Sequence, residues 1–274
     1  MLNFKNRKNT IRNLIFIQKI RSLQMISFTH LHVHTQYSIL DGASDVPALV
    51  KKAKDDGMPA VCITDHGNMF GVKHFYNESK KQGIKPILGC EIYIASGSRF
   101  EKTGKEDRSG NHLILLAKNK IGYENLSKIV SYAWIEGFYY TPRIDWDLLR
   151  KYHEGIIACS ACLGGEVPQA IMEKGEDVGE AKALEYKALF GEDFYLELQR
   201  HKSGDPKKDE EVYKEQVKVN EVLIRIAKKN DIKLIATNDV HFINAEDAEA
   251  HDRLICLNTG KDLDDPTRMK YTKQ

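Results

Sequence analysis

Apolar and polar residues alternate along this chain in blocks, with short apolar runs between longer stretches whose apolar positions recur every three or four residues. Short runs of this kind are typical of buried β-strands, and the longer spacing is typical of amphipathic helices. The seven predicted strands are about 27–33, 60–64, 86–94, 112–117, 155–159, 194–198 and 233–237. The predicted helices lie near 45–56, 69–82, 121–135, 165–190 and 207–230. This strand-then-helix order predicts an α/β fold with a parallel sheet, either closed into a barrel or doubly wound.

Turn residues agree with these boundaries. Asp45 precedes a first helical turn that contains Pro47, and Gly57 follows the end of that helix. Gly83 ends the next predicted helix, as glycine commonly does. Residues 96–110 form a polar and charged stretch between two predicted strands. A loop of this length is commonly a lid, a binding loop or a partly disordered segment.

Two short patterns at opposite ends of the chain carry metal-binding side chains. His32 and His34 flank one valine, and Asp239 and His241 flank another. Residues two positions apart on a strand point to the same face, so each pair would lie on one side of the sheet. In a closed barrel the first and last strands are neighbours. The four side chains are therefore expected to meet at one rim, where barrel enzymes place their chemistry.

Further residues of the same chemical kind lie on or next to other predicted strands, most of them at strand ends: Asp65, His66, Glu91, His112 and Cys162. Glu91 is an acid inside an apolar strand, and burying an unpaired acid is costly, so a metal ion would account for it. Asp65 has three interpretations: a ligand, a helix cap, or a carboxylate that orients a neighbouring ligating histidine.

The other histidines are weaker candidates. His30 lies on the same predicted face as His32 and His34, so geometry alone leaves its role open. His74, His153, His201 and His251 are isolated, and an isolated histidine is more often a hydrogen-bonded structural residue than a ligand.

Composition allows a single large soluble domain. The chain has 274 residues, of which 42% are hydrophobic and 29% charged, enough for an α/β barrel. No stretch approaches the roughly 20 apolar residues that a membrane helix needs. Five cysteines, an odd number, predict a reducing, cytoplasmic compartment. Cys62, Cys90 and Cys256 are expected to be small core residues. Cys159 and Cys162 have a redox or zinc-knuckle spacing, but no second pair completes a four-cysteine zinc site.

The first 24 residues carry six basic side chains and no acidic ones, whereas the whole chain has a net charge of +2. The remainder is therefore mildly acidic, with four more acids than bases, and no basic groove for duplex DNA is evident. Three interpretations of the segment stay open: an organelle transit peptide, a nucleic-acid-binding arm, or an extension outside the fold. We exclude residues 1–24 from the predicted barrel.

Several long blocks of this sequence, taken in order, resemble the polymerase and histidinol phosphatase (PHP) domain. More narrowly, they are similar to the PHP domain that opens the bacterial DNA polymerase III alpha subunit. The resemblance covers about residues 27–274 and implies a distorted, TIM-like barrel of seven strand–helix units. The matching blocks are 28–42, 60–71, 86–95, 111–117, 136–145, 161–166 and 236–241.

The resemblance implies a metal site with nine ligands. They are His32, His34, Asp41, His66, Glu91, His112, Cys162, Asp239 and His241. Asp41 enters the set only through the resemblance, which also gives Asp65 a supporting role. The donor types suit zinc, and the carboxylates also admit manganese or iron. We expect two or three ions, with Glu91 bridging a pair.

The implied activity is metal-assisted phosphoester hydrolysis, with a 3′-5′ exonuclease that proofreads a primer end as the leading interpretation. The residues expected to carry it are His32, His34, Glu91, Asp239 and His241. Arg143 and Arg99 are candidate phosphate contacts, because guanidinium groups suit oxyanions. Three alternatives stay open: a pyrophosphatase role for the same centre, a catalytically silent scaffold that docks a separate proofreading subunit, and a free-standing phosphatase similar to histidinol phosphatase.

The resemblance also implies a domain plan and partners. Residues 25–260 would form the PHP domain, and 261–274 would begin the connection to a polymerase core that this chain lacks. The expected partners are DNA at a primer 3′ end, the remaining polymerase domains and, through the longer protein, a proofreading subunit and a sliding clamp.

Overall fold

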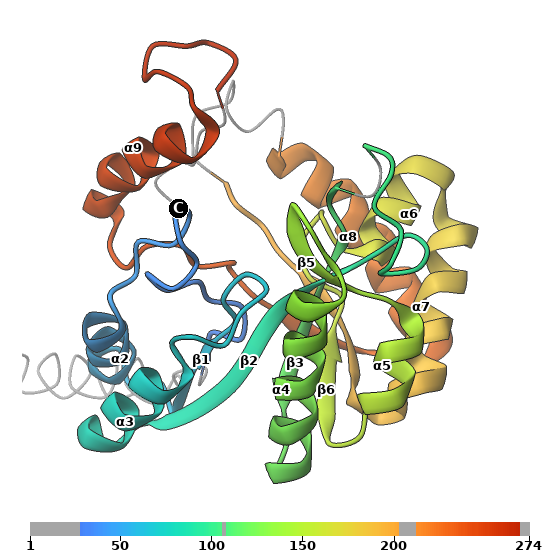
Figure 1. Ribbon diagram of the computed structural model, residues 1–274, viewed down its shortest axis with the longest axis horizontal. Helices are drawn as coiled ribbons and strands as arrows, with labels where there is room; N and C mark the ends of the chain where they lie inside the picture. The colour runs from blue at the N-terminus through green and yellow to red at the C-terminus, as the bar shows by residue number, and fades with distance from the viewer. Residues whose placement is uncertain (1–27, 106–107, 203–211, 269–274) are drawn as a thin grey trace, which may run out of the picture.

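The computed structural model describes residues 28–105, 108–202 and 212–268 (Figure 1). The basic segment 1–24, the residues before Phe28 in the first predicted strand, and the start of the helix predicted at 207–230 lie outside the described residues. Within the described ranges, no helix combines the length and the apolar character that a membrane crossing requires.

A strongly curved sheet forms the centre of the fold. Its main strands are β1 (Ala60–Ile63), β2 (Lys85–Ile94), β3 (Asn111–Ala117), β6 (Ile156–Cys159), β7 (Phe194–Leu198) and β8 (Lys233–Ala236). β1 pairs with β2, β6 with β7 and β7 with β8, all in parallel. β3 is antiparallel to both of its neighbours, β2 and β6. Among the predicted strands, the expectation of a parallel sheet is therefore wrong at β3.

Backbone hydrogen bonds around Val33 close the sheet. The Thr64 amide donates to the Val33 carbonyl over 2.8 Å, which joins this segment to the end of β1. On its other side the His34 amide donates to the Val240 carbonyl over 2.7 Å, and the Val240 amide donates to the His32 carbonyl over 3.1 Å. The first predicted strand is thus reduced, in the described part, to a single bridge between Val33 and Val240. The α/β, TIM-like barrel expected from the sequence is confirmed in a distorted form: six of the seven predicted strands are present, and the first is represented by this bridge.

Helices surround the barrel; those at 146–152 and 248–259 were not among the predicted ones, and the others lie where the apolar spacing predicted. The helices are α2 (Val46–Asp55), α3 (Val72–Gln82), α4 (Lys120–Ile135), α5 (Trp146–Tyr152), α6 (Glu166–Lys174), α7 (Glu176–Phe190), α8 (Val212–Asn230) and α9 (Ala248–Thr259). Asp45 caps α2 by accepting a hydrogen bond from the Ala48 amide. The single helix predicted at 165–190 is in fact two, because Gly175 adopts φ +91° and ends α6.

Several smaller elements had no clear apolar signal. The strands β4 (Phe138–Tyr139) and β5 (Thr141–Ile144) form a hairpin, and β5 pairs in parallel with the end of β2. Two short 3₁₀ turns, η2 (Gly191–Asp193) and η3 (Ala245–Asp247), precede β7 and α9.

The apolar core has three parts. One packs the outer face of the sheet against α4 to α8, and a second packs Val33 and β1 against α2 and α3 on the other side of the molecule (Figure 1). The third is the small cluster Cys62, Ile114, Leu116, Cys159 and Ala161, from strands on several sides of the barrel. This third cluster faces the inside of the barrel. Because successive side chains on a strand point to opposite faces, residues two positions away from a member of this cluster also point into the barrel.

Candidate metal centre

The register of the sheet directs several polar side chains into the barrel. Glu91 pairs with Ile114, which pairs with Cys159, and paired residues point to the same face. Ile114 and Cys159 belong to the interior cluster, so Glu91 faces the interior as well. His112 lies two residues before Ile114 and shares its face. The barrel interior is therefore apolar in one part and polar in another.

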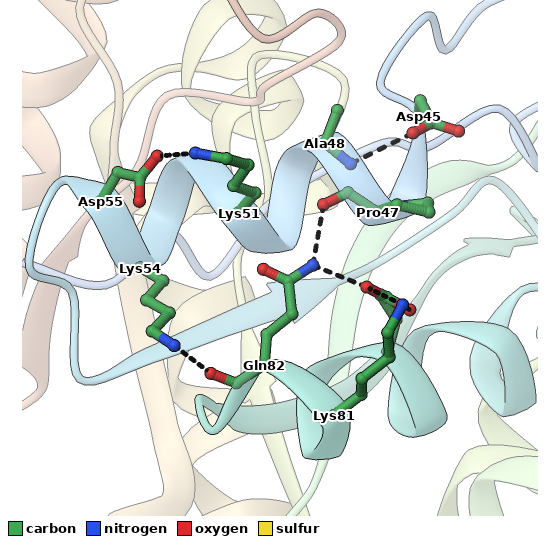
Figure 2. Close-up of a pocket in the computed structure, with 9 residues that line it drawn as sticks. Asp45, Pro47, Ala48, Lys51, Lys54, Asp55, Lys81 and Gln82 are labelled. Atoms are coloured by element: carbon green, nitrogen blue, oxygen red, sulfur yellow. Dashed lines mark hydrogen bonds and ion pairs between the residues drawn. The ribbon is translucent and has the colours of Figure 1, made fainter.

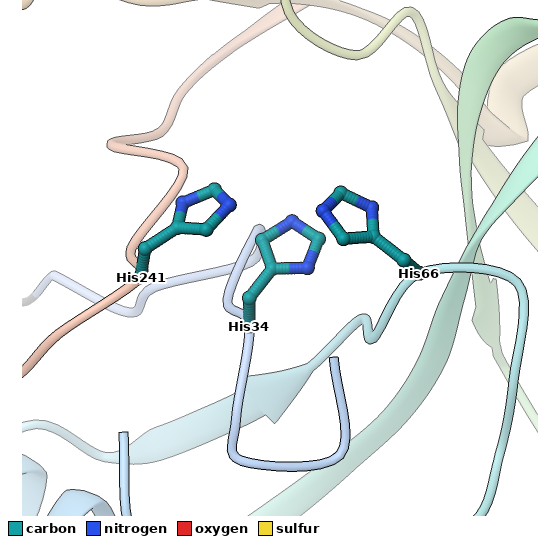
Figure 3. A group of neighbouring side chains, drawn as sticks. All are labelled: His34, His66 and His241. Carbon is teal, nitrogen blue, oxygen red and sulfur yellow. The ribbon is translucent and has the colours of Figure 1, made fainter. Parts of the chain in front are cut away.

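All nine predicted ligands meet in this polar part, and we call them the ligand cluster. They are His32, His34, Asp41, His66, Glu91, His112, Cys162, Asp239 and His241. Each has a side-chain nitrogen, oxygen or sulfur atom within 3.6 Å of such an atom on another member. Three subsets have donor atoms close enough together to hold one metal ion each. These subsets are His34 with His66 and His241, His32 with His34 and Glu91, and Glu91 with His112 and Cys162. Figure 3 shows the rings of the first subset converging from three segments.

The Glu91 carboxylate lies at the centre of the ligand cluster and is almost completely buried. Its Oε1 is 2.6 Å from His112 Nδ1 and 3.6 Å from His32 Nε2. Its Oε2 is 2.5 Å from His66 Nδ1 and 3.4 Å from His34 Nε2. The two oxygens thus face different histidines, as a carboxylate that bridges two ions would require.

Asp239 and Asp41 supply the other two carboxylates. Asp239 Oδ1 lies 3.1 Å from His32 Nε2 and 3.2 Å from His34 Nε2. Asp41 Oδ2 lies 2.6 Å from His66 Nε2 and 3.5 Å from His241 Nε2. Asp239 adopts φ +51°, a left-handed conformation that is uncommon outside glycine and occurs most often in asparagine and aspartate. This backbone conformation is unfavourable in free energy, and strained residues of this kind are common at functional sites.

Hydrogen bonds at Nδ1 orient three of the histidine rings. His32 Nδ1 is 2.7 Å from Glu197 Oε1, His34 Nδ1 is 3.0 Å from Ser38 Oγ, and His241 Nδ1 is 2.8 Å from the Asp239 carbonyl. A carboxylate and a carbonyl can only accept, so His32 and His241 donate from Nδ1 and present Nε2 to the cluster. Ser38 Oγ donates to Asp65, so it accepts from His34 Nδ1 in the same way. Bonds of this kind are typical of metal-ligating histidines.

The donor atoms of the cluster fit a cationic occupant. Within the described residues, His32 Nε2, His34 Nε2, both Glu91 carboxylate oxygens and Asp239 Oδ1 are buried and have no partner with hydrogen-bond geometry. Buried polar atoms are normally satisfied, and leaving several of them unsatisfied in one place is costly. Nitrogen, oxygen and sulfur donors at this spacing match the ligands of zinc and of other divalent transition metals.

The charges of the cluster depend on one another. Burial and the adjacent imidazoles of His66 and His241 lower the pKa of His34 to about 3. Burial opposes protonation of His66 as well, but the carboxylates of Glu91 and Asp41 raise its pKa to about 10. Burial would raise the pKa of Glu91, yet His112 and His66 hold it well below its usual range. The carboxylates thus stay ionised and require nearby positive charge.

Cys162 completes the cluster beside His112. Its Sγ lies 3.6 Å from His112 Nδ1, and the backbone of the Cys162 loop pairs with β3 through a bridge between His112 and Gly165. Burial, reinforced by Asp239 and Glu91, raises the pKa of the thiol well above its usual value. A bound cation reverses this preference, because a coordinating thiol is deprotonated.

Three residues that support the cluster were missed by the sequence prediction. Glu197 holds His32, Ser38 holds His34, and His251 on α9 holds the Asp41 loop through a 2.7 Å contact from Nε2 to the Asp41 carbonyl. Glu197 could have been found, because it is an acid inside an apolar strand, as Glu91 is. Ser38 and His251 carry no such signal, since a serine and an isolated histidine are common in ordinary structural roles.

Asp65 takes a supporting position without touching a ligand ring. Its carboxylate accepts hydrogen bonds from the Thr35 amide over 2.6 Å and from Ser38 Oγ over 2.8 Å. It therefore acts on His34 only through Ser38. Burial raises the pKa of Asp65, although these hydrogen bonds oppose the change.

The structure contradicts the phosphate-contact prediction for two arginines. Arg143 is completely buried and donates to the carbonyls of Gly137, Arg99 and Glu101. The Arg99 guanidinium pairs with Glu136 over 2.7 Å and with Asp145 over 2.9 Å. Both guanidinium groups use their hydrogen bonds to hold the segment after β2 against β5, so neither is available to bind a phosphate.

The histidines that the sequence left open lie outside the ligand cluster. His30 is partly buried against Phe28 in a T-shaped contact, and its nearby charged groups are Asp56 and Lys52 at the end of α2. His74, His153 and His201 make hydrogen bonds to a tyrosine or to backbone carbonyls, as structural residues do.

A surface hollow of about 570 Å³ between α2 and α3 is separate from this centre (Figure 2). Its lysines are already engaged: Lys51 pairs with Asp55, Lys54 donates to the Gln82 carbonyl, and Lys81 pairs with Glu78. We assign the hollow no function, because its charges compensate one another.

Comparison with known proteins agrees with the geometry of the cluster. A family model described as the PHP domain matches residues 30–201. The chain is 47% identical over 246 residues to the DNA polymerase III subunit alpha of Borreliella burgdorferi, and 43% identical over 250 residues to that of Thermus aquaticus. It spans only 20% of the length of each relative, while 89% and 90% of this chain are matched.

Among solved structures, an amidohydrolase from Chromobacterium violaceum is similar with a TM-score of 0.49 and 13% identity, over 78% of this chain and 87% of that one. We draw no functional conclusion from a likeness at this level. The family match covers well over half of the chain and includes the elements that build most of the ligand cluster. The chain therefore belongs to the PHP domain family.

Proposed function

We propose that this chain binds two or three divalent ions in the ligand cluster and hydrolyses phosphoesters there, with a 3′ nucleotide end as the substrate. Zinc and manganese are the proposed metals, and iron is a further option, because the donor set combines imidazoles, carboxylates and a thiol. The proposed activity is 3′-5′ exonucleolytic proofreading within a longer replicative polymerase.

One observation carries this proposal: buried donor atoms of the cluster face one another without hydrogen-bond geometry. A cluster built only for stability would pair these atoms, since an unsatisfied buried polar group costs about 1–3 kcal/mol. Relatives that are polymerase subunits favour the nucleotide substrate over a small-molecule phosphatase.

The residues of the chain have distinct tasks in this reaction. His32, His34 and His241 present Nε2 from rings fixed at Nδ1, and Asp239 supplies an oxygen between the first two. Glu91 holds the two halves of the centre together through its two oxygens. Divalent ions held by such donors supply a water nucleophile at neutral pH and stabilise negative charge on the phosphate.

The exposure of the cluster indicates where a phosphate would enter. The side chains of His32, His34 and Glu91 are essentially inaccessible, whereas those of His66 and His112 are 21% and 27% exposed. We propose that the substrate approaches from the side of His66 and His112, while His32 and Glu91 exclude water from the opposite side.

The longer protein would supply the polymerase core, contacts to DNA, and attachment to a proofreading subunit and a sliding clamp in the cytoplasm. These partners are proposals, because the chain spans only a fifth of the relatives it matches.

The test measures bound metal and nuclease activity in the same preparations. Purified protein is analysed for metal and then incubated with Mn²⁺ and a primer labelled at its 3′ end, beside a His32→Ala, His34→Ala double variant. We expect the wild type to bind at least two ions and to shorten the primer, and the variant to do neither.

Other outcomes separate the alternatives. If the wild type binds metal and leaves the primer intact, the scaffold interpretation replaces the catalytic one. Turnover of a small phosphate monoester in place of the primer would favour the phosphatase alternative.

A further inference from the structure

A network of buried polar groups lies directly behind His32. It consists of Glu197 on β7, Gln199 just after β7, and Thr237 just after β8. Glu197 Oε1 is 2.7 Å from His32 Nδ1, accepts from Gln199 Nε2 over 2.9 Å, and accepts from the Thr237 hydroxyl. Neither the family match nor the sequence prediction assigns these residues a role.

The sheet register places Glu197 in the interior. Cys159 pairs with Tyr195, and Glu197 lies two residues further along β7, on the same face. It is paired in register with Ile235 on β8, and both Tyr195 and Ile235 pack against the interior apolar cluster. A carboxylate in this position is costly unless it is paired, and the structure pairs it with the His32 ring.

The direction of these hydrogen bonds fixes what His32 can do. Gln199 Nε2 and the Thr237 hydroxyl both donate to Glu197 Oε1, so this oxygen acts as an acceptor. His32 must then donate from Nδ1, which leaves Nε2 directed at Asp239, 3.1 Å away, and at Glu91, 3.6 Å away. The ring is completely buried, so it has little freedom to turn away.

We propose that Glu197 is a positioning residue for the metal centre: it holds the His32 ring so that Nε2 faces the ligand cluster, with Gln199 and Thr237 keeping the carboxylate in place. This inference rests on the proposed function only in requiring that the cluster binds metal. Carboxylates that orient ligating histidines typically contribute about 10–100-fold to metal affinity.

A purely structural role makes a different prediction. Because Glu197 and Thr237 link β7 to β8, removing the carboxylate could lower the melting temperature of the metal-free protein alone. A positioning role requires in addition a loss of metal affinity in protein that is still folded. The two roles are therefore separated by measuring both quantities.

The experiment uses Zn²⁺ as the probe and compares wild type with Glu197→Ala, Glu197→Gln and Asp145→Asn. Asp145 is a buried carboxylate paired with Arg99 outside the ligand cluster, so Asp145→Asn is the matched control. Affinity is measured by competition with a chromophoric chelator, and melting temperature is measured in EDTA.

We expect Glu197→Ala to weaken Zn²⁺ binding by about 10–100-fold. Glu197→Gln keeps an acceptor oxygen without the charge, and a neutral hydrogen bond is roughly half as strong, so the loss should be about three- to tenfold. Asp145→Asn should lower the melting temperature and leave Zn²⁺ affinity unchanged. In the zinc-loaded wild type, the ¹H–¹⁵N spectrum should show a downfield His32 Nδ1 proton that Glu197→Ala loses.

Wild-type Zn²⁺ affinity in Glu197→Ala would overturn the proposal, whatever its melting temperature. If Glu197→Ala does not fold, Glu197→Gln decides, and an unchanged affinity in that variant overturns it. Zinc binding without primer cleavage in the wild type would refute the proposed activity and leave the role of Glu197 standing. A wild type that binds no zinc would overturn both.

Discussion

Replacing Glu91 by glutamine tests the charge balance of the ligand cluster most directly. Glutamine has the same shape, so the packing of β2 should be kept while one negative charge is removed. The Glu91 carboxylate lies within 2.6 Å of nitrogens on both His66 and His112. Its loss removes the proposed bridge between ions, so we expect Glu91→Gln to bind at most one ion and to be inactive.

The same substitution should also destabilise the metal-free protein, and the pKa of His66 indicates by how much. Burial lowers that pKa, but Glu91 and Asp41 outweigh burial and raise it from 6.5 to about 10, a net shift that corresponds to roughly 5 kcal/mol. Glu91 shares this stabilisation of the protonated His66 ring with Asp41. We therefore expect Glu91→Gln to lower the free energy of unfolding by about 3 kcal/mol, a value typical of a buried ion pair that loses one partner. For a domain of this size that loss lowers the melting temperature by about 6–12 °C.

The pH dependence of this loss follows from the direction of the shift. A group whose pKa is raised in the folded state contributes its full stability below the unfolded value of 6.5, and the contribution disappears as the pH rises through about 10. The deficit of Glu91→Gln should therefore be largest near pH 6 and shrink toward pH 10. Chemical unfolding in EDTA at these two pH values measures it, with the exposed Glu173→Gln as control.

Two results would refute this reasoning. Equal unfolding free energies for Glu91→Gln and wild type at pH 6 would mean that Glu91 does not compensate His66. An unchanged metal content in Glu91→Gln would mean that the carboxylate does not bridge ions.

Three further predictions concern residues around the centre. Arg143→Met should lose about 3 kcal/mol or more in urea unfolding, because three backbone carbonyls lose their donor, and primer binding by the folded fraction should be unchanged. Asp145→Asn should destabilise the protein at pH 7 but not well below pH 3.8. Burial raises the pKa of Asp145, but hydrogen bonds with Arg99 outweigh burial, so the pKa in the folded protein is lowered. The stability that the ionised carboxylate contributes is therefore lost as the pH falls through this lowered value. Gly165→Ala should weaken Zn²⁺ binding by tenfold or more in a chelator competition. The Cβ of the alanine would lie 2.0 Å from the Ser160 carbonyl oxygen and would displace the loop that carries Cys162. An unchanged Zn²⁺ affinity would show that the loop adjusts without moving Cys162.

Much of the fold was predictable because local patterns determine it. Six of the seven apolar runs are strands within one or two residues of the predicted bounds, since strands covered on both faces are largely apolar runs. Gly83 in the left-handed conformation ends α3 where the sequence indicated. The break at Gly175 was missed because one glycine within a helical pattern is usually tolerated.

The supporting contacts were less predictable because they join distant parts of the chain. His32 and Glu197 are separated by 165 positions, and Asp41 and His251 by 210. No spacing rule connects such residues. Only the register of the barrel, which the sequence alone does not specify, brings Glu197 behind His32.

The antiparallel orientation of β3, which the sequence prediction missed, determines where His112 lies relative to the ligand cluster. An apolar run has no direction, so its residues alone did not reveal that β3 is antiparallel to β2 and β6. His112 lies near the start of β3, whereas Glu91 lies in the second half of β2 and the ligands His66, Cys162 and Asp239 follow the ends of β1, β6 and β8. In an all-parallel barrel the start of this strand would lie at the opposite rim, about 20 Å from the other ligands at roughly 3.3 Å per residue. The contact of His112 with Glu91 at 2.6 Å therefore depends on the reversed strand, and a ligand at the start of a strand was itself a signal of reversal.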